Sequence, residues 1–336
     1  MTFRALSKII QSGFRLSPQN ESKMGNAENV CLLWPINKLE KRVRFVADPF
    51  FLDPETILVE VFADFPREKW IGAVSIINPD MPVYLGDVLR VSGEEFSFPF
   101  VFSFDGEEFL IPQRTQTPNN ITGAGTNSLL YLYKLRRKER LTGGDALCPK
   151  ADFLSSLEIH GVDPIIFAVE GVWYLAVTFG RQLRLYFSDN PVLGGWVLHP
   201  CSPLPIKGRH ARCAGRPLLW DGRFFLFLQE SFPNYGFATR IYEITALSKQ
   251  TFCAYEVAWS PMTCAQSTGK WNANGMHHVD FDPQTCRAII DGHTNSQGWR
   301  IALVKNVIWG RPIFPMNWRS RLALLKSVFK NVLNKL

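Results

Sequence analysis

A short phrase returns along this chain at long intervals. Each copy has a proline, an apolar run typical of a strand, and then an acidic or glycine turn. Four copies begin at Pro49, Pro99, Pro164 and Pro217, at steps of 50, 65 and 53 residues. A fifth copy lacks the proline and begins near His277, 60 residues further on. Strand-built repeats of this length are typical of propeller blades and not of helical solenoids.

The third copy shows the internal pattern of one repeat. Apolar runs at 162–169, 172–179, 183–188 and 196–199 are separated by turns rich in Gly, Asp, Asn and Pro. Four strands per repeat and five repeats predict an all-β fold, a five-bladed β-propeller. A pair of β-sandwiches or an irregular β-solenoid explains repeats of 50 to 65 residues less well.

Both ends of the chain differ from this pattern, which predicts three segments. Residues 1–40 form a lead-in with a short helix, and residues 41–312 form the propeller. Residues 313–336 form a basic amphipathic helix, because apolar residues recur there at helical spacing. Its part from Arg319 to Leu336 holds five Lys or Arg and no acid. Two readings stay open: docking on an anionic membrane surface, or packing on the propeller or on a partner subunit.

Composition excludes several classes of protein. The net charge is +7, but without the tail (319–336) it is about +2. The rest of the chain is therefore not expected to bind nucleic acid. Seven scattered cysteines without a CxxC pair disfavour a disulfide framework and a zinc site. No apolar run resembles a signal peptide or a membrane span, which predicts a cytoplasmic protein, peripheral at the inner face of the membrane if the tail docks there. No glycine-rich nucleotide motif is present, and we expect no cofactor and no metal.

Two copies of the phrase begin with Asp-Pro, and they provide the candidate catalytic pair. Inner strands of a propeller converge on the axis, so Asp48 and Asp163 should face each other across one mouth of the central tunnel. Two converging carboxylates suit glycosyl transfer, in which one acts as base or nucleophile and the other as acid. The plainer alternative is an ordinary turn whose carboxylate caps nearby N–H groups.

Two further acids lie on second strands. Glu230 is the candidate third catalytic residue, or else a solvated strand-end residue. Glu60 lies within an apolar run, so it is either buried and paired or functional, since a lone buried carboxylate is costly.

Cationic and histidine side chains supply candidate binding residues. The segment from Lys207 to Arg216 holds five side chains that can carry positive charge. It can bind a phosphate or a sugar diphosphate, with Arg212 and Arg216 at the mouth, or it is a solvated basic loop. Arg114 is a similar candidate in the second repeat. His277 and His293 can bind sugar hydroxyls, or they are core histidines.

These motifs together resemble the propeller domain of the glucosamine inositolphosphorylceramide transferase family. The resembling stretches are Ala47 to Phe50, Phe98 to Phe102, Phe109 to Gln113, Asp163 to Pro164, Trp173 to Leu175, Ser188 to Trp196, Ala214 to Arg216, Gln229 to Glu230, Tyr235 to Gly236, Gly275 to His277 and Ile290 to Gly292. More distantly, the chain is similar to the family-43 and family-62 glycoside hydrolases, which share the propeller.

The resemblance implies roles for three acids. Asp48 would be the base, Asp163 a carboxylate that tunes a pKa, and Glu230 the acid. Gln113 stands where we expect a glutamate, and an amide cannot ionise. In the plant members a nucleotide-diphospho-sugar transferase domain follows the propeller, and these 336 residues contain no counterpart of it.

Three functions remain open at this point. The favoured one is a glycosyltransferase of surface polysaccharide or glycolipid assembly that uses an activated sugar donor such as a nucleotide sugar. The paired Asp-Pro sites favour a glycoside hydrolase, which the lack of an export signal makes the weaker of the two enzyme readings. The glutamine at 113 and the missing domain suit a noncatalytic sugar-binding module.

The membrane reading of the tail predicts a simple result. Deletion of 319–336 should abolish flotation of the protein with liposomes that contain anionic lipid, because it removes five cations and an apolar helix face. Liposomes of neutral lipid are the control. Flotation that survives the deletion would contradict the membrane role and favour the packed helix.

Overall fold

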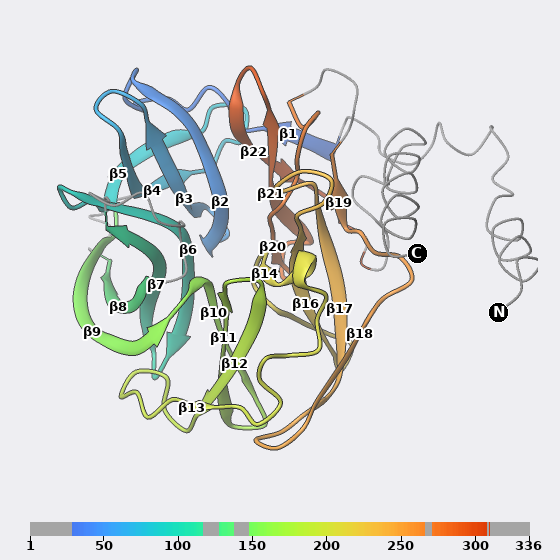
Figure 1. Ribbon diagram of the computed structural model, residues 1–336. Helices are drawn as coiled ribbons and strands as arrows, with labels where there is room; N and C mark the ends of the chain where they lie inside the picture. The colour runs from blue at the N-terminus through green and yellow to red at the C-terminus, as the bar shows by residue number, and fades with distance from the viewer. Residues whose placement is uncertain (1–28, 117–127, 138–147, 266–270, 308, 310–336) are drawn as a thin grey trace, which may run out of the picture.

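Five antiparallel sheets stand around a common axis in this protein (Figure 1). The computed structural model describes residues 29–116, 128–137, 148–265, 271–307 and 309. The predicted five-bladed propeller is confirmed. The helices expected near the N-terminus and at 313–336 lie outside the described residues. Within them the one helical element is the short 3-10 helix η3 (Gly208–His210), and no helix is long and apolar enough to span a bilayer.

Each blade places its first strand on the axis and the following strands outward. In blades 1 to 3 these are β2 (Val43–Asp53), β3 (Thr56–Ala63), β4 (Glu68–Ser75) and β5 (Val83–Leu89); β6 (Glu94–Phe104), β7 (Glu107–Gln116), β8 (Leu129–Arg136) and β9 (Lys150–His160); and β10 (Val162–Val169), β11 (Val172–Phe179), β12 (Gln182–Ser188) and β13 (Val197–Leu198). The strands predicted for the third repeat are therefore found within one or two residues of their expected bounds.

Blade 4 is more irregular and blade 5 is completed from the other end of the chain. The strands of blade 4 are β14 (Arg212–Cys213), β15 (Leu218–Trp220), β16 (Arg223–Glu230), β17 (Ala238–Leu247), β18 (Phe252–Glu256) and β19 (Thr263–Cys264). Blade 5 runs outward through β20 (Val279–Asp282), β21 (Arg287–Thr294), β22 (Gly298–Val304) and β1 (Val30–Leu32).

The strand β1 corrects the predicted lead-in of 1–40. Val30 pairs with Val304 and Leu32 with Ala302, so β1 is the outer strand of the last blade. The propeller therefore begins before residue 41, and its two ends close the ring. Three residues are too few to show a strand period, and only the pairing with β22 reveals this strand.

A left-handed residue before the proline breaks the inner strand of blades 1, 2 and 3. The φ angles of Asp48, Phe98 and Asp163 are 47°, 48° and 52°. At each of these sites the ladder to the second strand shifts register. Asp tolerates this conformation better than most residues. Because of the bulge, the left-handed residue at the mouth does not pair with the second strand of its blade.

Blade 4 departs from this alignment. There the residue with positive φ is Gly215, at 145°, and the proline comes two residues later instead of one. A Cβ at Gly215 would lie 1.8 Å from the carbonyl oxygen of Val279 on blade 5. Gly215, and not Arg216, therefore occupies the position equivalent to Asp48, and blades 4 and 5 touch through backbone.

Aromatic rings close the tunnel below the mouth, and the guanidinium of Arg216 packs against them. The ring of Phe50 meets those of Phe98, Phe100 and His278 edge-on, with centroids 4.5–5.5 Å apart. Arg216 lies 5.4 Å from the ring of Phe100. Because this centre is filled by side chains of several blades, the sheets cannot move independently.

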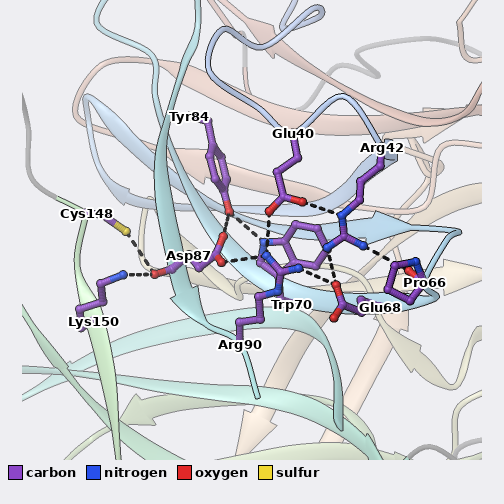
Figure 2. A network of polar contacts seen from close by, with 10 residues as sticks. All are labelled: Glu40, Arg42, Pro66, Glu68, Trp70, Tyr84, Asp87, Arg90, Cys148 and Lys150. Atoms are coloured by element: carbon purple, nitrogen blue, oxygen red, sulfur yellow. Dashed lines mark hydrogen bonds and ion pairs between the residues drawn. The ribbon is translucent and has the colours of Figure 1, made fainter. Parts of the chain in front are cut away.

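Figure 2 shows a network of polar contacts on the outer part of blade 1. The indole of Trp70 is fully buried and donates to the hydroxyl of Tyr84 at 2.8 Å, while the guanidinium of Arg90 lies 4.1 Å from the Trp70 ring centroid. Arg90 also donates to Glu40 at 2.8 Å, and Lys150 of β9 donates to the carbonyl of Asp87 at 2.5 Å. The network ties the segment before β2, blade 1 and blade 2 together.

The close approach at Gly215 predicts a large loss of stability on Gly215→Ala. The added Cβ meets rigid backbone and the φ angle is strained, so we expect a loss of at least about 3 kcal/mol, measured by urea unfolding. Gly222→Ala is the matched control, because Gly222 also has positive φ but nothing lies within 4 Å of its Cβ position. It should cost about 1–2 kcal/mol. Equal losses in the two variants would contradict the contact between blades.

Candidate functional site

Two carboxylates and a histidine meet where blades 1 and 5 adjoin at the mouth. Nδ1 of His277 lies 2.7 Å from Oδ2 of Asp291, and Nε2 of the same ring lies 3.7 Å from Oδ1 of Asp48. Asp291 is fully buried, and the side chain of Asp48 is 13% exposed. The three groups form a line that leads from the interior to the surface of the mouth.

Asp291 is the anchor of this line. Its carboxylate accepts hydrogen bonds from the backbone N–H groups of His277 and His278, both at 3.1 Å, and from that of Asp48 at 3.3 Å. One buried side chain of β21 therefore fixes the entry to β20 and the bulge of β2 together. Sequence reasoning missed this residue as a site residue, although the Ile290 to Gly292 motif was part of the family resemblance.

The burial of this cluster changes how it holds protons. Burial raises the pKa of Asp48 well above its ordinary value, and His277 opposes this shift while Glu60, Asp291 and Asp163 add to it. Burial alone would lower the pKa of His277, but the charge of Asp291, its hydrogen bond and the charge of Asp48 outweigh it, so the pKa is raised. Asp48 and His277 thus titrate as a coupled pair that can share one proton.

His278 differs from its neighbour because it is neutral. Burial lowers the pKa of His278 to about 3. Its Nε2 lies 2.9 Å from the carbonyl oxygen of Pro49, so in the neutral ring this nitrogen carries the hydrogen. Nδ1 then offers a lone pair, has no hydrogen-bond partner among the described residues, and lies 3.9 Å from Oδ1 of Asp48. A ligand hydroxyl or a water at Asp48 can donate to it.

Asp163 lies at the same bulge position in blade 3, and Arg212 holds it. The guanidinium donates to both carboxylate oxygens, at 2.5 and 3.0 Å. Arg212 is therefore paired with Asp163, and the role expected for it in binding an anion stays a prediction. The charge of Asp163 is among those that raise the pKa of Asp48, so the two acids influence each other across the mouth.

Tyr235 and Trp299 complete the site, and sequence reasoning assigned neither of them a role. The ring of His277 stacks on Trp299 at 3.9 Å, and Tyr235 meets His277 edge-on at 5.5 Å. Tyr235 is 52% exposed, so its ring borders the opening. A Cβ at Gly236 would lie 2.7 Å from Trp299. The Tyr235-Gly236 pair, noted only as part of the resemblance, was the available signal.

The two acids on second strands, Glu230 and Glu60, are buried and paired with cationic side chains. Glu230 is fully buried, 2.7 Å from Nε2 of His210 and 3.1 Å from Arg240. Burial would raise the pKa of Glu230, but the hydrogen bond and charge of His210 outweigh it and lower the pKa. An ionised carboxylate without exposure cannot donate a proton to a ligand, so we correct the acid role expected of Glu230. Glu60 is buried and paired with Lys69 at 2.9 Å, as one of its two expected readings had it.

Arg114, Arg216 and His293 lie outside the mouth cluster in different ways. Arg114 donates to both carboxylate oxygens of Glu94, each at 2.6 Å. Arg216 reaches across the axis to Asp280 at 3.1 Å and to the carbonyl oxygen of Val101 at 2.6 Å. Both guanidinium groups are held by protein acceptors, and their expected role in binding stays a prediction. His293 stands behind Trp299, with ring centroids 4.9 Å apart.

One donor set in this cluster fits a cation. Ligand atoms of Asp48, His277 and Asp291 lie within 4.8 Å of one another. Two carboxylates and an imidazole suit a divalent ion such as Mn²⁺ or Zn²⁺. The same contacts are satisfied by the shared proton described above, and the mechanism below needs only that proton.

The comparisons with known proteins point to one family. A model described as glucosamine inositolphosphorylceramide transferase 1, N-terminal, matches residues 157–293. The expected resemblance to this family is confirmed. A protein of that name from Arabidopsis thaliana is 28% identical over 249 residues, and one from Oryza sativa subsp. japonica is 23% identical over 251. These alignments cover 70% of this chain but only about 30% of each relative.

Solved structures show the same fold at low sequence identity. A glycoside hydrolase matches with a TM-score of 0.56 and 10% identity over 94% of this chain and 99% of its own. The catalytic domain of a family-62 α-L-arabinofuranosidase from Coprinopsis cinerea matches with a TM-score of 0.53 and 14% identity, over 81% and 94%. The likeness to the propeller of family-62 hydrolases is thus a likeness of fold.

The raised pKa of Asp48 predicts that this residue destabilises the protein. The folded state resists ionisation, so above the ordinary value of 3.8 the unfolded chain loses the proton more readily and stability falls as pH rises. Asp48→Asn should therefore raise the Tm at pH 7 relative to wild type, and the gain should vanish near pH 4. Asp53→Asn is the control, since Asp53 begins the other Asp-Pro of the same strand and pairs with Arg137. A lower Tm for Asp48→Asn at pH 7 would contradict the assigned environment.

Proposed function

We propose that the mouth of this propeller binds a sugar and takes part in glycosyl transfer during assembly of a glycolipid or surface polysaccharide. The observation that carries the proposal is the protonatable carboxyl of Asp48 at the open end of the line through His277 to Asp291. A buried, strained and destabilising acid in a concave mouth is typical of a functional site. The transferase relatives support transfer over other sugar chemistry.

The chemistry follows from where the proton sits. In transfer, the bond between the anomeric carbon and the leaving phosphate oxygen breaks, and a bond to the acceptor oxygen forms. The acceptor hydroxyl gives its proton to Asp48 in the ionised state. His277 stabilises that ionised state, and Asp291 fixes the orientation of the His277 ring through Nδ1. Asp163, neutralised by Arg212, remains a hydrogen-bond acceptor for ring hydroxyls.

The border of the mouth suits a sugar. A half-exposed tyrosine ring packs against the apolar face of a pyranose, and its hydroxyl supplies a polar contact at the same time. A phenol ordinarily titrates at about pH 10, so the hydroxyl of Tyr235 is protonated at neutral pH and can donate. Sugar recognition thus rests on Tyr235 and the carboxylates.

The relatives also bear on the acceptor. They are named for a transfer to inositolphosphorylceramide, which is a membrane lipid. A lipid acceptor would be consistent with docking of 319–336 on an anionic membrane at the cytoplasmic side, and we include this docking in the proposal. The flotation experiment tests it separately.

Hydrolysis is the alternative that a specific observation favours, because the solved neighbours with this fold include glycoside hydrolases. Water would then take the place of the acceptor hydroxyl at Asp48. Hydrolysis of a glycoside needs an acid that protonates the leaving oxygen. Glu230 cannot serve as that acid, because it is buried and its lowered pKa keeps it ionised. A phosphate leaving group needs no such acid, which favours transfer from an activated donor.

Sugar turnover by single variants tests the proposal. Asp48→Asn should lower kcat/KM by about 10²-fold or more, because an amide cannot take up the acceptor proton. Asp163→Asn should lower it as well, by releasing Arg212. The measurement uses a panel of nucleotide sugars with a lipid or glycan acceptor, and a panel of aryl glycosides.

The matched control is Asp53→Asn, which changes an Asp-Pro at the last residue of β2, away from the mouth, and should stay within about twofold of wild type. Loss of nucleotide-sugar transfer in both mouth variants supports the transferase, and loss of aryl-glycoside cleavage supports the hydrolase. Binding of sugars by wild type and variants without turnover in any form would overturn both enzymes in favour of a binding module.

A further inference from the structure

A group of four cations, three of which have no acidic partner among the described residues, lies on the rim of the mouth between blades 3 and 4. Arg181 and Lys207 are exposed, and Arg184 and Arg209 are half-buried. Among the described residues, Arg181, Arg184 and Lys207 form no ion pair. We call these four residues the rim cluster. In contrast, Arg114, Arg212 and Arg216 each hold a carboxylate.

The backbone brings the rim cluster together from two segments. Arg181 lies in the turn between β11 and β12, at the end of the blade where the mouth opens. A Cβ at Gly208 would lie 3.2 Å from the carbonyl oxygen of Arg181, so the 3-10 helix η3 packs directly on that turn. Lys207 and Arg209 flank Gly208 and are thus held beside Arg181.

Two of the guanidinium groups are already oriented. That of Arg184 lies 3.8 Å from the centroid of the Phe179 ring. Such stacking leaves the N–H edge of the group available. Nε of Arg209 lies 3.3 Å from Nε2 of His210 and 3.6 Å from Glu230. The carboxylate of Glu230 is shared with His210 and Arg240, and the terminal amino groups of Arg209 have no partner among the described residues.

The rim cluster lies close enough to the mouth for one ligand to contact both. Arg209 precedes Arg212 by three residues, which span at most about 10 Å, and Arg212 holds Asp163 in the mouth. A sugar bound at Asp48 and Asp163 can therefore place an attached phosphoryl group among these cations. Arginine and lysine together suit phosphate oxygens, which accept several charge-assisted hydrogen bonds.

We propose that the rim cluster is the subsite for a phosphoryl group of the substrate whose sugar lies in the mouth. This inference rests on the proposed function and narrows its substrate class to sugars that carry a phosphate ester. Two sources share this chemistry: the diphosphate of a nucleotide sugar, and the phosphodiester of an inositol lipid headgroup. Binding should weaken as salt rises, because the cluster is exposed.

Calorimetry with small phosphates tests the subsite on the full chain. The probes are pyrophosphate, uridine diphosphate and glycerophosphoinositol, each at low and at raised salt. The triple variant Arg181→Gln, Lys207→Gln and Arg209→Gln should weaken binding of the preferred probe at least tenfold, which corresponds to about 1.4 kcal/mol. A preference for the diphosphates indicates the nucleotide sugar, and a preference for glycerophosphoinositol indicates the lipid headgroup.

A second triple variant provides the control, with the same change in charge. Lys134→Gln, Arg136→Gln and Lys249→Gln remove three cations, one exposed and two half-buried, at the opposite end of the blades, where each pairs with an acid. This variant should bind like wild type. Equal loss in both triple variants, or no phosphate binding by wild type, would overturn the subsite.

The mouth variant Asp48→Asn separates the two proposals. It should keep phosphate binding while it loses sugar turnover. Phosphate binding at the rim without turnover in wild type would leave the subsite standing and refute the enzyme. Unimpaired turnover and phosphate binding in the rim variant would refute the subsite and leave the enzyme standing.

Discussion

The left-handed residue in front of the proline is the constraint on which the rest of the structure depends. It recurs at Asp48, Phe98 and Asp163, and at each site it shifts the register of the inner strand. A regular strand would turn alternate side chains to opposite faces of the sheet. The bulge instead directs the left-handed residue to the axis. Where that residue is Phe98 it fills the floor, and where it is an aspartate it becomes part of the mouth. The same backbone device therefore supplies both the core of the tunnel and its chemistry.

The centre of the molecule balances buried charges against one another. Asp291 and Asp280, both from blade 5, are fully buried and satisfied by groups from other blades. Asp291 accepts the backbone N–H of Asp48, and Asp280 accepts that of Phe51 at 2.8 Å and pairs with Arg216. Breaking either set would leave an unpaired carboxylate in the interior, which is costly. Asp48 is the exception, since burial raises its pKa although His277, 3.7 Å away, opposes the shift.

The site depends on closure of the ring. Asp48 comes from blade 1, while His277 and Asp291 come from blade 5, more than 200 residues later in the chain. The family model that matches 157–293 contains the second and third of these residues but not the first. The ring closes when β1 joins β22 as the outer strand of blade 5. The proton-holding line and the propeller therefore form together, and a partly folded chain would have neither.

The sequence by itself determined the number of blades, most of the strands and the position of Asp48 and Asp163 at one mouth. These follow from local patterns: proline before an apolar run, a turn after it, and a period of 50 to 65 residues. Only the tertiary structure decided what the charged side chains do. Arg212, Arg216 and Arg114 all look like free cations in the sequence, yet each holds a carboxylate, and for Arg212 and Arg216 that carboxylate lies on another blade. Glu230 looks like an acid, but His210 and Arg240 keep it ionised. The physical reason is that the charge state of a buried group depends on partners brought together by the packing of blades, and a one-dimensional pattern carries no record of those partners.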